Sequence, residues 1–116
     1  MRLIDRARAQ GDRLAEGLRS ALADHPRVGD LRGIGLLLCL ELVEDQETKR
    51  PFPRRAWVTE GVLDRAMELG LLLYPSTGNV DGVNGDYLLL GPPLTVLDDE
   101  VDLIVDRTTT ALGQLG

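Results

Sequence analysis

Lys49 is the only lysine of this 116-residue chain and the first candidate for covalent chemistry. A lysine that forms a Schiff base must be desolvated or otherwise tuned, so that its pKa falls and its amine becomes a nucleophile. Lys49 stands beside Arg50 in a charged stretch, residues 44–50, with nothing apolar nearby to bury it. We therefore expect a surface lysine without a catalytic role.

The other nucleophiles and bases are equally sparse. Cys39, the only cysteine, lies in an apolar strand pattern, where a thiol is usually unreactive and serves only to pack against its neighbours. His25, the only histidine, stands before a proline and is expected at the surface rather than as a general base for Ser20 or Ser76. One cysteine and one histidine do not make a transition-metal site. We expect no catalytic, cofactor-binding or metal-binding residue in this chain.

Two glycine-containing segments imitate ligand-binding motifs. Gly33-Ile34-Gly35 begins like a dinucleotide fingerprint, but Leu38 occupies the place of the third glycine and the pattern continues as strand. Residues 81–86 partly resemble a calcium-binding loop, but Val83 stands where an oxygen ligand is needed and no glutamate closes the loop. We expect a strand bulge at the first segment and a turn-rich connection at the second.

Composition excludes several classes of function. The net charge of −6 argues against binding nucleic acid, for which a basic surface is expected. No apolar run approaches the roughly 18 residues of a membrane span, and the first residues do not form a signal peptide. A lone cysteine fits the reducing cytoplasm. The expectation is a cytoplasmic protein that contacts neither nucleic acid nor membrane.

The hydrophobic pattern predicts an α+β fold with a small, mostly antiparallel sheet of three to four strands and helices packed on one face. Gly70 suits the position just past the second helix, and acidic residues open the third, where the helix dipole favours negative charge. The predicted elements are a helix over 1–24, a strand over 28–43, a helix over 56–69, strands over 71–74 and 87–90, and a helix over 98–115, with a loop over 75–85.

The long predicted strand is apolar on both faces in its middle. Alternation places one set of side chains on one face and Leu37, Cys39, Glu41 and Val43 on the other. A sheet with one wet face would carry polar residues at 37 and 39. Because one layer of helices covers only one face, we expect the second cover to come from outside this chain. The first set comprises Ile34, Leu36, Leu38, Leu40 and Leu42.

Three segments together resemble the C-terminal small domain of class III aminotransferases. Residues 28–36, VGDLRGIGL, resemble a strand of that domain. Residues 85–94, GDYLLLGPPL, followed by residues 99–102, DEVD, resemble its closing strand, double proline and acidic helix start. Residues 68–75, ELGLLLYP, fit between them, so order and spacing agree over nearly the whole chain.

The resemblance implies that residues 1–116 are one small domain whose large cofactor-binding domain is absent. Enzymes of this family are fold-type-I homodimers that transfer an amino group between an amine or amino acid and a keto acid or aldehyde. Pyridoxal phosphate is their cofactor, and the large domain supplies its Schiff-base lysine and phosphate contacts. The resemblance therefore implies a transaminase whose small domain, alone, binds no cofactor and is inactive.

The chain also departs from the family pattern. Leu89 stands where many members carry an arginine that grips a substrate carboxylate, three residues before the double proline. Gly82, Val83 and Asn84 occupy the loop where others carry a mobile arginine. No carboxylate clamp is therefore expected. The usual threonine cap of the last helix is Leu97, which removes a side-chain cap worth about 1 kcal/mol.

Thr77, Gly78 and Asn79 are the candidates for the substrate entrance, because they offer backbone amides and short polar side chains ahead of the closing strand. A plain turn-forming loop is the alternative for these three residues. For the chain as a whole, the alternatives are a stand-alone α+β ligand-binding or regulatory module, and a structural domain that binds a separate large subunit.

Overall fold

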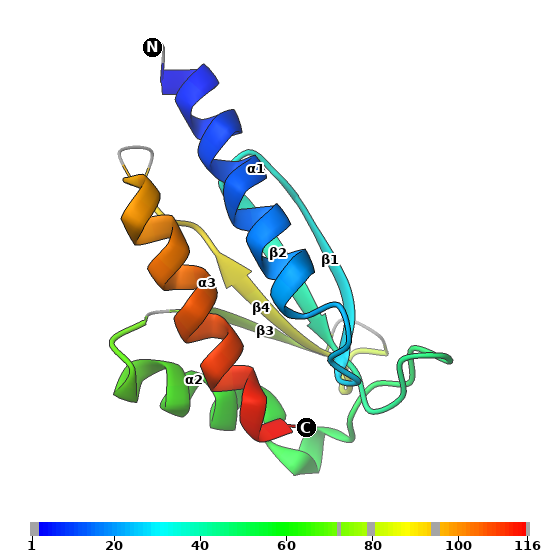
Figure 1. Ribbon diagram of the computed structural model, residues 1–116. Coiled ribbons are helices and arrows are strands. Elements are labelled where there is room, and N and C mark those ends of the chain that lie inside the picture. Colours follow the sequence, from blue (N-terminus) through cyan, green and yellow to red (C-terminus); the bar gives the residue numbers. More distant parts are fainter. Residues whose placement is uncertain (1–2, 72, 79–80, 94–95, 116) are drawn as a thin grey trace.

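The computed structural model describes residues 3–71, 73–78, 81–93 and 96–115. Helices and strands follow one another in the order helix, hairpin, helix, hairpin, helix (Figure 1). Their bounds are α1 Leu3–Ala21, β1 Val28–Ile34, β2 Leu37–Leu42, the 3-10 turn η1 Arg54–Ala56, α2 Val58–Glu68, β3 Tyr74–Thr77, β4 Asp86–Leu90, α3 Asp98–Leu112 and the 3-10 turn η2 Gly113–Leu115.

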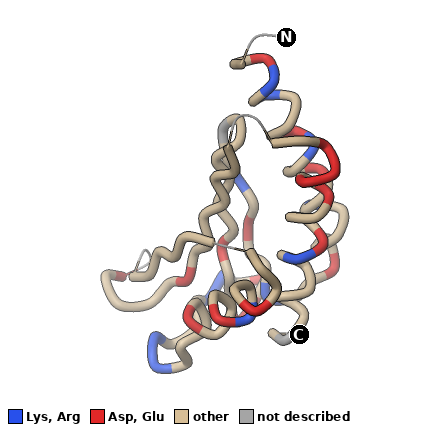
Figure 2. The backbone as a smooth tube through the Cα atoms, turned by 90° about the vertical axis from the view of Figure 1, so that its left-hand side faces the viewer, with Lys and Arg blue, Asp and Glu red and all other residues tan. Residues whose placement is uncertain are grey.

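The four strands form one antiparallel sheet in the order β1-β2-β4-β3, so β1 and β3 are its edges. Helix α1 packs on β1 and β2, α2 packs on β3 and β4, and α3 contacts both other helices. Figure 2 shows α1 and α3 on the same side of the sheet. The predicted α+β fold, with an antiparallel sheet and helices on one face, is confirmed.

The hydrophobic core lies between the sheet and the helices. Leu40 and Leu42 of β2 and Leu88 of β4 are fully buried there, which confirms the face predicted by alternation. They meet Leu18 of α1 and Leu112 of α3 in a single cluster. The apolar residues that recur every second position in the strands therefore face the same layer as the apolar stripes of the flanking helices.

The predicted continuous strand over 28–43 is wrong. The segment is a hairpin in which Val28 pairs with Leu42 and Ile34 with Leu37. The chain reverses at Gly35, whose φ of 57° lies in the left-handed region that glycine adopts without strain. The bulge expected at Gly33-Ile34-Gly35 is wrong, because these residues lead into the reversal, and the register shift lies instead between Val28 and Asp30.

The third strand lies further along the chain than predicted. The predicted strand over 71–74 is wrong except at its last residue, because β3 begins at Tyr74 and extends to Thr77. Leu73 is buried in the approach to the sheet, and Leu72 lies outside the described residues. The apolar character of Leu71 and Leu73 thus reflects burial in a connection rather than strand pairing. Pro75 is tolerated in β3 because this strand is an edge.

The helix ends are held by specific contacts. His25 accepts a hydrogen bond from the Arg27 amide at Nδ1 (3.1 Å), and its Nε2 donates to the Leu112 carbonyl (2.8 Å). The lone histidine is therefore half-buried and ties α1 to α3, rather than lying free at the surface. At the start of α3, the Leu97 amide donates to the Glu100 carboxylate (2.9 Å), which compensates in part for the missing threonine cap.

Candidate functional site

Among the residues that the structure describes, no helix packs on one face of the sheet, and we call this the open face. Directly paired residues of antiparallel strands share a face, so the pairing register defines its members. One row across the strands is Arg32, Cys39, Leu89 and Tyr74. The next row is Asp30, Glu41, Tyr87 and Ser76, and Leu37 extends the face at the hairpin end.

The apolar part of the open face is exposed. Leu37 is 61 % exposed and Tyr74 is 54 % exposed, although both lie in strands. Cys39 and Leu89, between them, are half-buried. Within the described part of the chain, no segment covers Leu37 or Tyr74, and for Leu37 this agrees with the predicted external cover. Val43 differs from that expectation, because it is buried against Gly29 by this chain's own residues.

The polar part of the open face forms a connected group. The Tyr87 hydroxyl donates to the Glu41 carboxylate (2.5 Å), and this hydrogen bond is the largest cause that raises the pKa of Tyr87. The Arg32 guanidinium lies over the Tyr87 ring, 5.6 Å from its centre, and pairs with Asp30 at 3.2 Å. The Arg32 cation is therefore engaged by Asp30 and by the Tyr87 ring.

Cys39 sits between these two parts. Desolvation by burial raises the pKa of its thiol, and the nearby Arg32 cation opposes that shift only in part. A raised pKa lowers the fraction of thiolate, which is the reactive form. This agrees with the expectation of an inert, packed cysteine.

The predicted entrance residues lie at the tip of the β3–β4 hairpin. Thr77 ends β3 opposite Asp86, so it belongs to a strand rather than to the predicted loop. Gly78 follows with a φ of 79°, and its amide donates to the Gly85 carbonyl (3.1 Å). Asn79, the third candidate, lies outside the described residues. In Figure 2 this hairpin extends beyond the sheet on the side away from α1 and α3.

The rest of the hairpin loop is fixed by Asp81 and Asn84. The Asp81 carboxylate accepts the amides of Asn84 (2.7 Å) and Val83 (3.0 Å), which hold the pKa of Asp81 below its usual value. The Asn84 side chain accepts the amide of Arg54 (2.9 Å) and so ties the loop to η1. The predicted turn-rich connection is therefore an ordered turn closed by its own side chains.

Sequence reasoning missed the role of Asp86. Its carboxylate is 1 % exposed and accepts hydrogen bonds from the Thr59 amide (3.1 Å) and the Thr59 hydroxyl. Thr59 lies in the first turn of α2, whose N-cap is Trp57, a residue without a capping oxygen. Asp86 thus caps α2 from a different element. No local pattern reveals a contact across 27 residues, and only the Gly-Asp pair of the family resemblance marked this position.

The residues of this chain do not fit a pyridoxal phosphate site. The Lys49 amine donates to the Gly29 carbonyl at the edge of β1, and this half of the β2–α2 connection lies at the surface. Among the described residues, no other amine is available for a Schiff base, because the chain has one lysine. Lys49 thus lies at the surface, as expected, and its lack of a catalytic role stays a prediction.

Comparison with known proteins identifies the class. Residues 1–112 match the model of the class III aminotransferase family, and the chain belongs to this family. An uncharacterized aminotransferase of Schizosaccharomyces pombe is 38 % identical over 110 residues, which are 95 % of this chain and 24 % of that protein. The taurine–pyruvate aminotransferase of Bilophila wadsworthia is 33 % identical over 115 residues, 97 % of this chain and 25 % of that protein.

Solved structures agree with the sequence relatives. A Bacillus anthracis aminotransferase superposes with a TM-score of 0.86 at 35 % identity, covering 97 % of this chain and 24 % of that one. An omega transaminase from Pseudomonas jessenii superposes with a TM-score of 0.82 at 33 % identity, covering 98 % of this chain and 23 % of that one. The chain therefore spans about a quarter of the length of these relatives.

In the described part of the chain, no helix is long and apolar enough to cross a bilayer. The family is one of pyridoxal-phosphate enzymes.

Proposed function

We propose that this chain is the small domain of a cytoplasmic, homodimeric pyridoxal-phosphate aminotransferase, and that its open face packs against a large cofactor-binding domain outside residues 1–116. The intact enzyme transfers an amino group between an amine or amino acid and a keto acid or aldehyde. Alone, this chain binds no cofactor and has no activity. The exposure of Leu37 and Tyr74 on the uncovered face of the sheet is the observation that carries the proposal.

The energetics favour a cover on that face. Burying the exposed part of Leu37 contributes about 1 kcal/mol, and Tyr74 and Leu89 add to the same surface. A stand-alone module would instead place polar side chains at these positions. Since the first relatives are about four times as long as this chain, the matching enzymes contain ample sequence to supply the cover.

Thr77, Gly78 and Asn79 are proposed to border the substrate entrance of the intact enzyme. Support comes from the hairpin that carries them, which extends from the sheet on the side of the open face (Figure 2). Leu89 lies on the same open face as Tyr74, with which it pairs, and contributes no charge there. The role of the chain is to close and shape the site, because the residues that bind the cofactor would belong to the large domain.

The open face can be tested with a dye that becomes fluorescent on exposed apolar surface. We expect the chain to bind the dye, and Leu37→Ser to lower the fluorescence. Leu103→Ser is the matched control, because Leu103 is also exposed (44 %) but lies on α3. Equal fluorescence of the wild type and Leu37→Ser, at equal stability, would contradict an apolar docking face.

Catalytic dependence on the large domain needs a second measurement. We expect no aldimine absorbance when the isolated chain is mixed with pyridoxal phosphate. A stoichiometric aldimine that disappears in Lys49→Ala would overturn the proposal. In a chimera, this chain replaces the matching segment of the Bacillus subtilis aminotransferase YodT, which is 35 % identical over 103 residues. This chimera should bind the cofactor, and Leu37→Asp should weaken its cofactor binding.

A further inference from the structure

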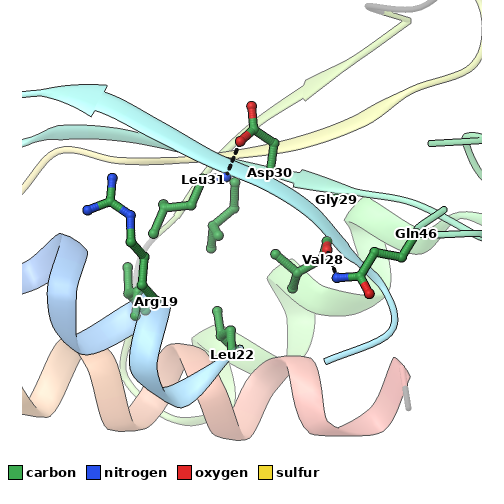
Figure 3. Close-up of a pocket in the computed structure, with 9 residues that line it drawn as sticks. Arg19, Leu22, Val28, Gly29, Asp30, Leu31 and Gln46 are labelled. Atoms are coloured by element: carbon green, nitrogen blue, oxygen red, sulfur yellow. Dashed lines mark hydrogen bonds between the residues drawn. The ribbon is translucent and has the colours of Figure 1, made fainter. Parts of the chain in front are cut away.

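A cavity on the helix side of the sheet, remote from the open face, has the features of a small-molecule site. It has a volume of about 150 Å³ and lies between the C-terminal end of α1 and the edge strand β1 (Figure 3). Its apolar wall is formed by Leu18, Leu22, Val28, Leu31 and Leu40. Apolar cavities of about this volume accommodate a compact hydrocarbon group.

The cavity has one cation at its mouth. Arg19 lines the cavity, and Figure 3 shows its side chain rising from α1 toward β1. Arg19 is exposed, and its guanidinium has no hydrogen-bond or ion-pair partner among the residues that the structure describes. The other arginines near this end of α1 are occupied: Arg27 bonds carbonyl oxygens, and Arg13 pairs with Asp102.

The acidic side chain beside the cavity does not neutralise Arg19. Asp30 contributes to the lining, but its carboxylate lies on the opposite side of β1 from α1 (Figure 3). There it accepts the Leu31 amide (2.9 Å) and pairs with Arg32 (3.2 Å). The third polar side chain, Gln46, is held by its donation to the Val28 carbonyl (2.9 Å). The charge balance at the mouth therefore favours an anion.

We propose that this cavity binds a small monocarboxylate with a short branched hydrocarbon chain, whose carboxylate pairs with Arg19 and whose hydrocarbon chain contacts the leucine-rich wall. The carbonyl groups that end α1 carry partial negative charge, so the carboxylate sits at the guanidinium rather than at the helix end. A planar guanidinium also matches a carboxylate in geometry. The site is separate from the proposed substrate entrance, because the sheet lies between them.

The test is an NMR titration of the isotope-labelled chain with isovalerate at constant ionic strength, with sodium chloride as the reference salt. We expect saturable shifts of the amides of Arg19, Leu31 and Gln46. The matched cation 3-methylbutylamine has nearly the same hydrocarbon shape and should leave these amides unchanged. Acetate, which lacks the hydrocarbon chain, should bind more weakly than isovalerate.

Two variants separate the head group from the cavity wall. Arg19→Gln should weaken isovalerate binding about fivefold, as expected for a partly exposed ion pair. Arg8→Gln is the matched control, because Arg8 is exposed on the same helix but does not line the cavity, and it should bind like the wild type. Leu31→Trp should block the cavity.

Several results would overturn the proposal. They are equal binding of the amine, undiminished binding by Arg19→Gln, shifts that fail to saturate, and shifts centred on Leu37 and Tyr74 of the open face. If Leu31→Trp does not fold, the comparison of Arg19→Gln with Arg8→Gln still decides the question.

Discussion

Asp86 of β4 and Thr59 of α2 are joined by two hydrogen bonds inside the core, one from the Thr59 amide (3.1 Å) and one from its hydroxyl. Both residues are almost completely buried. The pair fixes the first turn of α2 to the strand that follows the candidate entrance. It also explains how α2 starts at Val58, although Trp57 has a left-handed φ of 53° and no capping oxygen.

Removing the Asp86 carboxylate is expected to be strongly destabilising. Asp86→Ala leaves the amide and hydroxyl of Thr59 buried without an acceptor, which costs about 3 kcal/mol of unfolding free energy. Asp86→Asn keeps one acceptor oxygen and should cost about 1 kcal/mol. Urea unfolding measures both. Asp106→Ala, at an exposed position of α3, is the control and should change stability by less than about 0.5 kcal/mol.

Gly11 provides a second stability test, because it touches the β1–β2 turn. A Cβ atom on Gly11 would lie 2.0 Å from the carbonyl oxygen of Gly35, a backbone atom that cannot rotate away. Gly11→Ala should therefore destabilise the chain by about 3 kcal/mol, despite the better helix propensity of alanine. Gly61→Ala is the matched control in α2, where a Cβ meets nothing within 4 Å. It should stabilise by about 0.5–1 kcal/mol, and equal effects of the two substitutions would contradict the close approach.

These two contacts show what the sequence could and could not predict. The alternation over 36–42 located the buried face of β2 correctly, because a strand period is a local property. The sequence around Gly35 predicts a bulge rather than the reversal found there, since no Asn-Gly or Asp-Gly pair marks the turn. The close approach of Gly35 to Gly11 is not marked in the sequence either, because it arises only once α1 lies on the sheet.

The candidate site shows the same division. The exposed position of Leu37 followed from a pattern that was apolar on both faces of one strand. The shift of β3 to Tyr74–Thr77 did not, because buried apolar residues in a connection look like a strand in sequence. The Arg32–Tyr87–Glu41 group also could not be predicted, since its members come from three strands whose register the sequence does not specify.

The pair Arg13–Asp102 predicts a pH dependence of stability. Asp102 accepts two hydrogen bonds from the Arg13 guanidinium (2.8 and 3.0 Å), which lower the pKa of the carboxyl from 3.8. A folded-state pKa below the unfolded value stabilises the fold above the unfolded pKa. That contribution is lost as the pH falls through the folded pKa.

The wild type should thus be more stable than Arg13→Ala at neutral pH, and this difference in stability should vanish in acid below the usual pKa of aspartate. Carboxyl NMR should show the Asp102 pKa return toward 3.8 in Arg13→Ala, and an unchanged pKa would exclude this pair as the cause.

Cys39 provides a chemical readout of the open face. Burial raises the pKa of its thiol above 9.0, so less thiolate is present at pH 8 than in a free cysteine. Alkylation by iodoacetamide should therefore be several-fold slower for the folded chain than for free cysteine, because only the thiolate reacts. Urea should restore the rate of an exposed thiol, and this recovery is the internal control.

Leu37→Ser removes an apolar neighbour of Cys39 on the same face without touching the helix side, and it should accelerate the alkylation of Cys39 more than Leu103→Ser does. If the folded wild type reacts as fast as free cysteine, the thiol is not desolvated and the open face is wetter than its apolar residues indicate. In the YodT chimera proposed above, a large domain seated on this face should suppress the reaction further, whereas an unchanged rate would mean that the face remains uncovered.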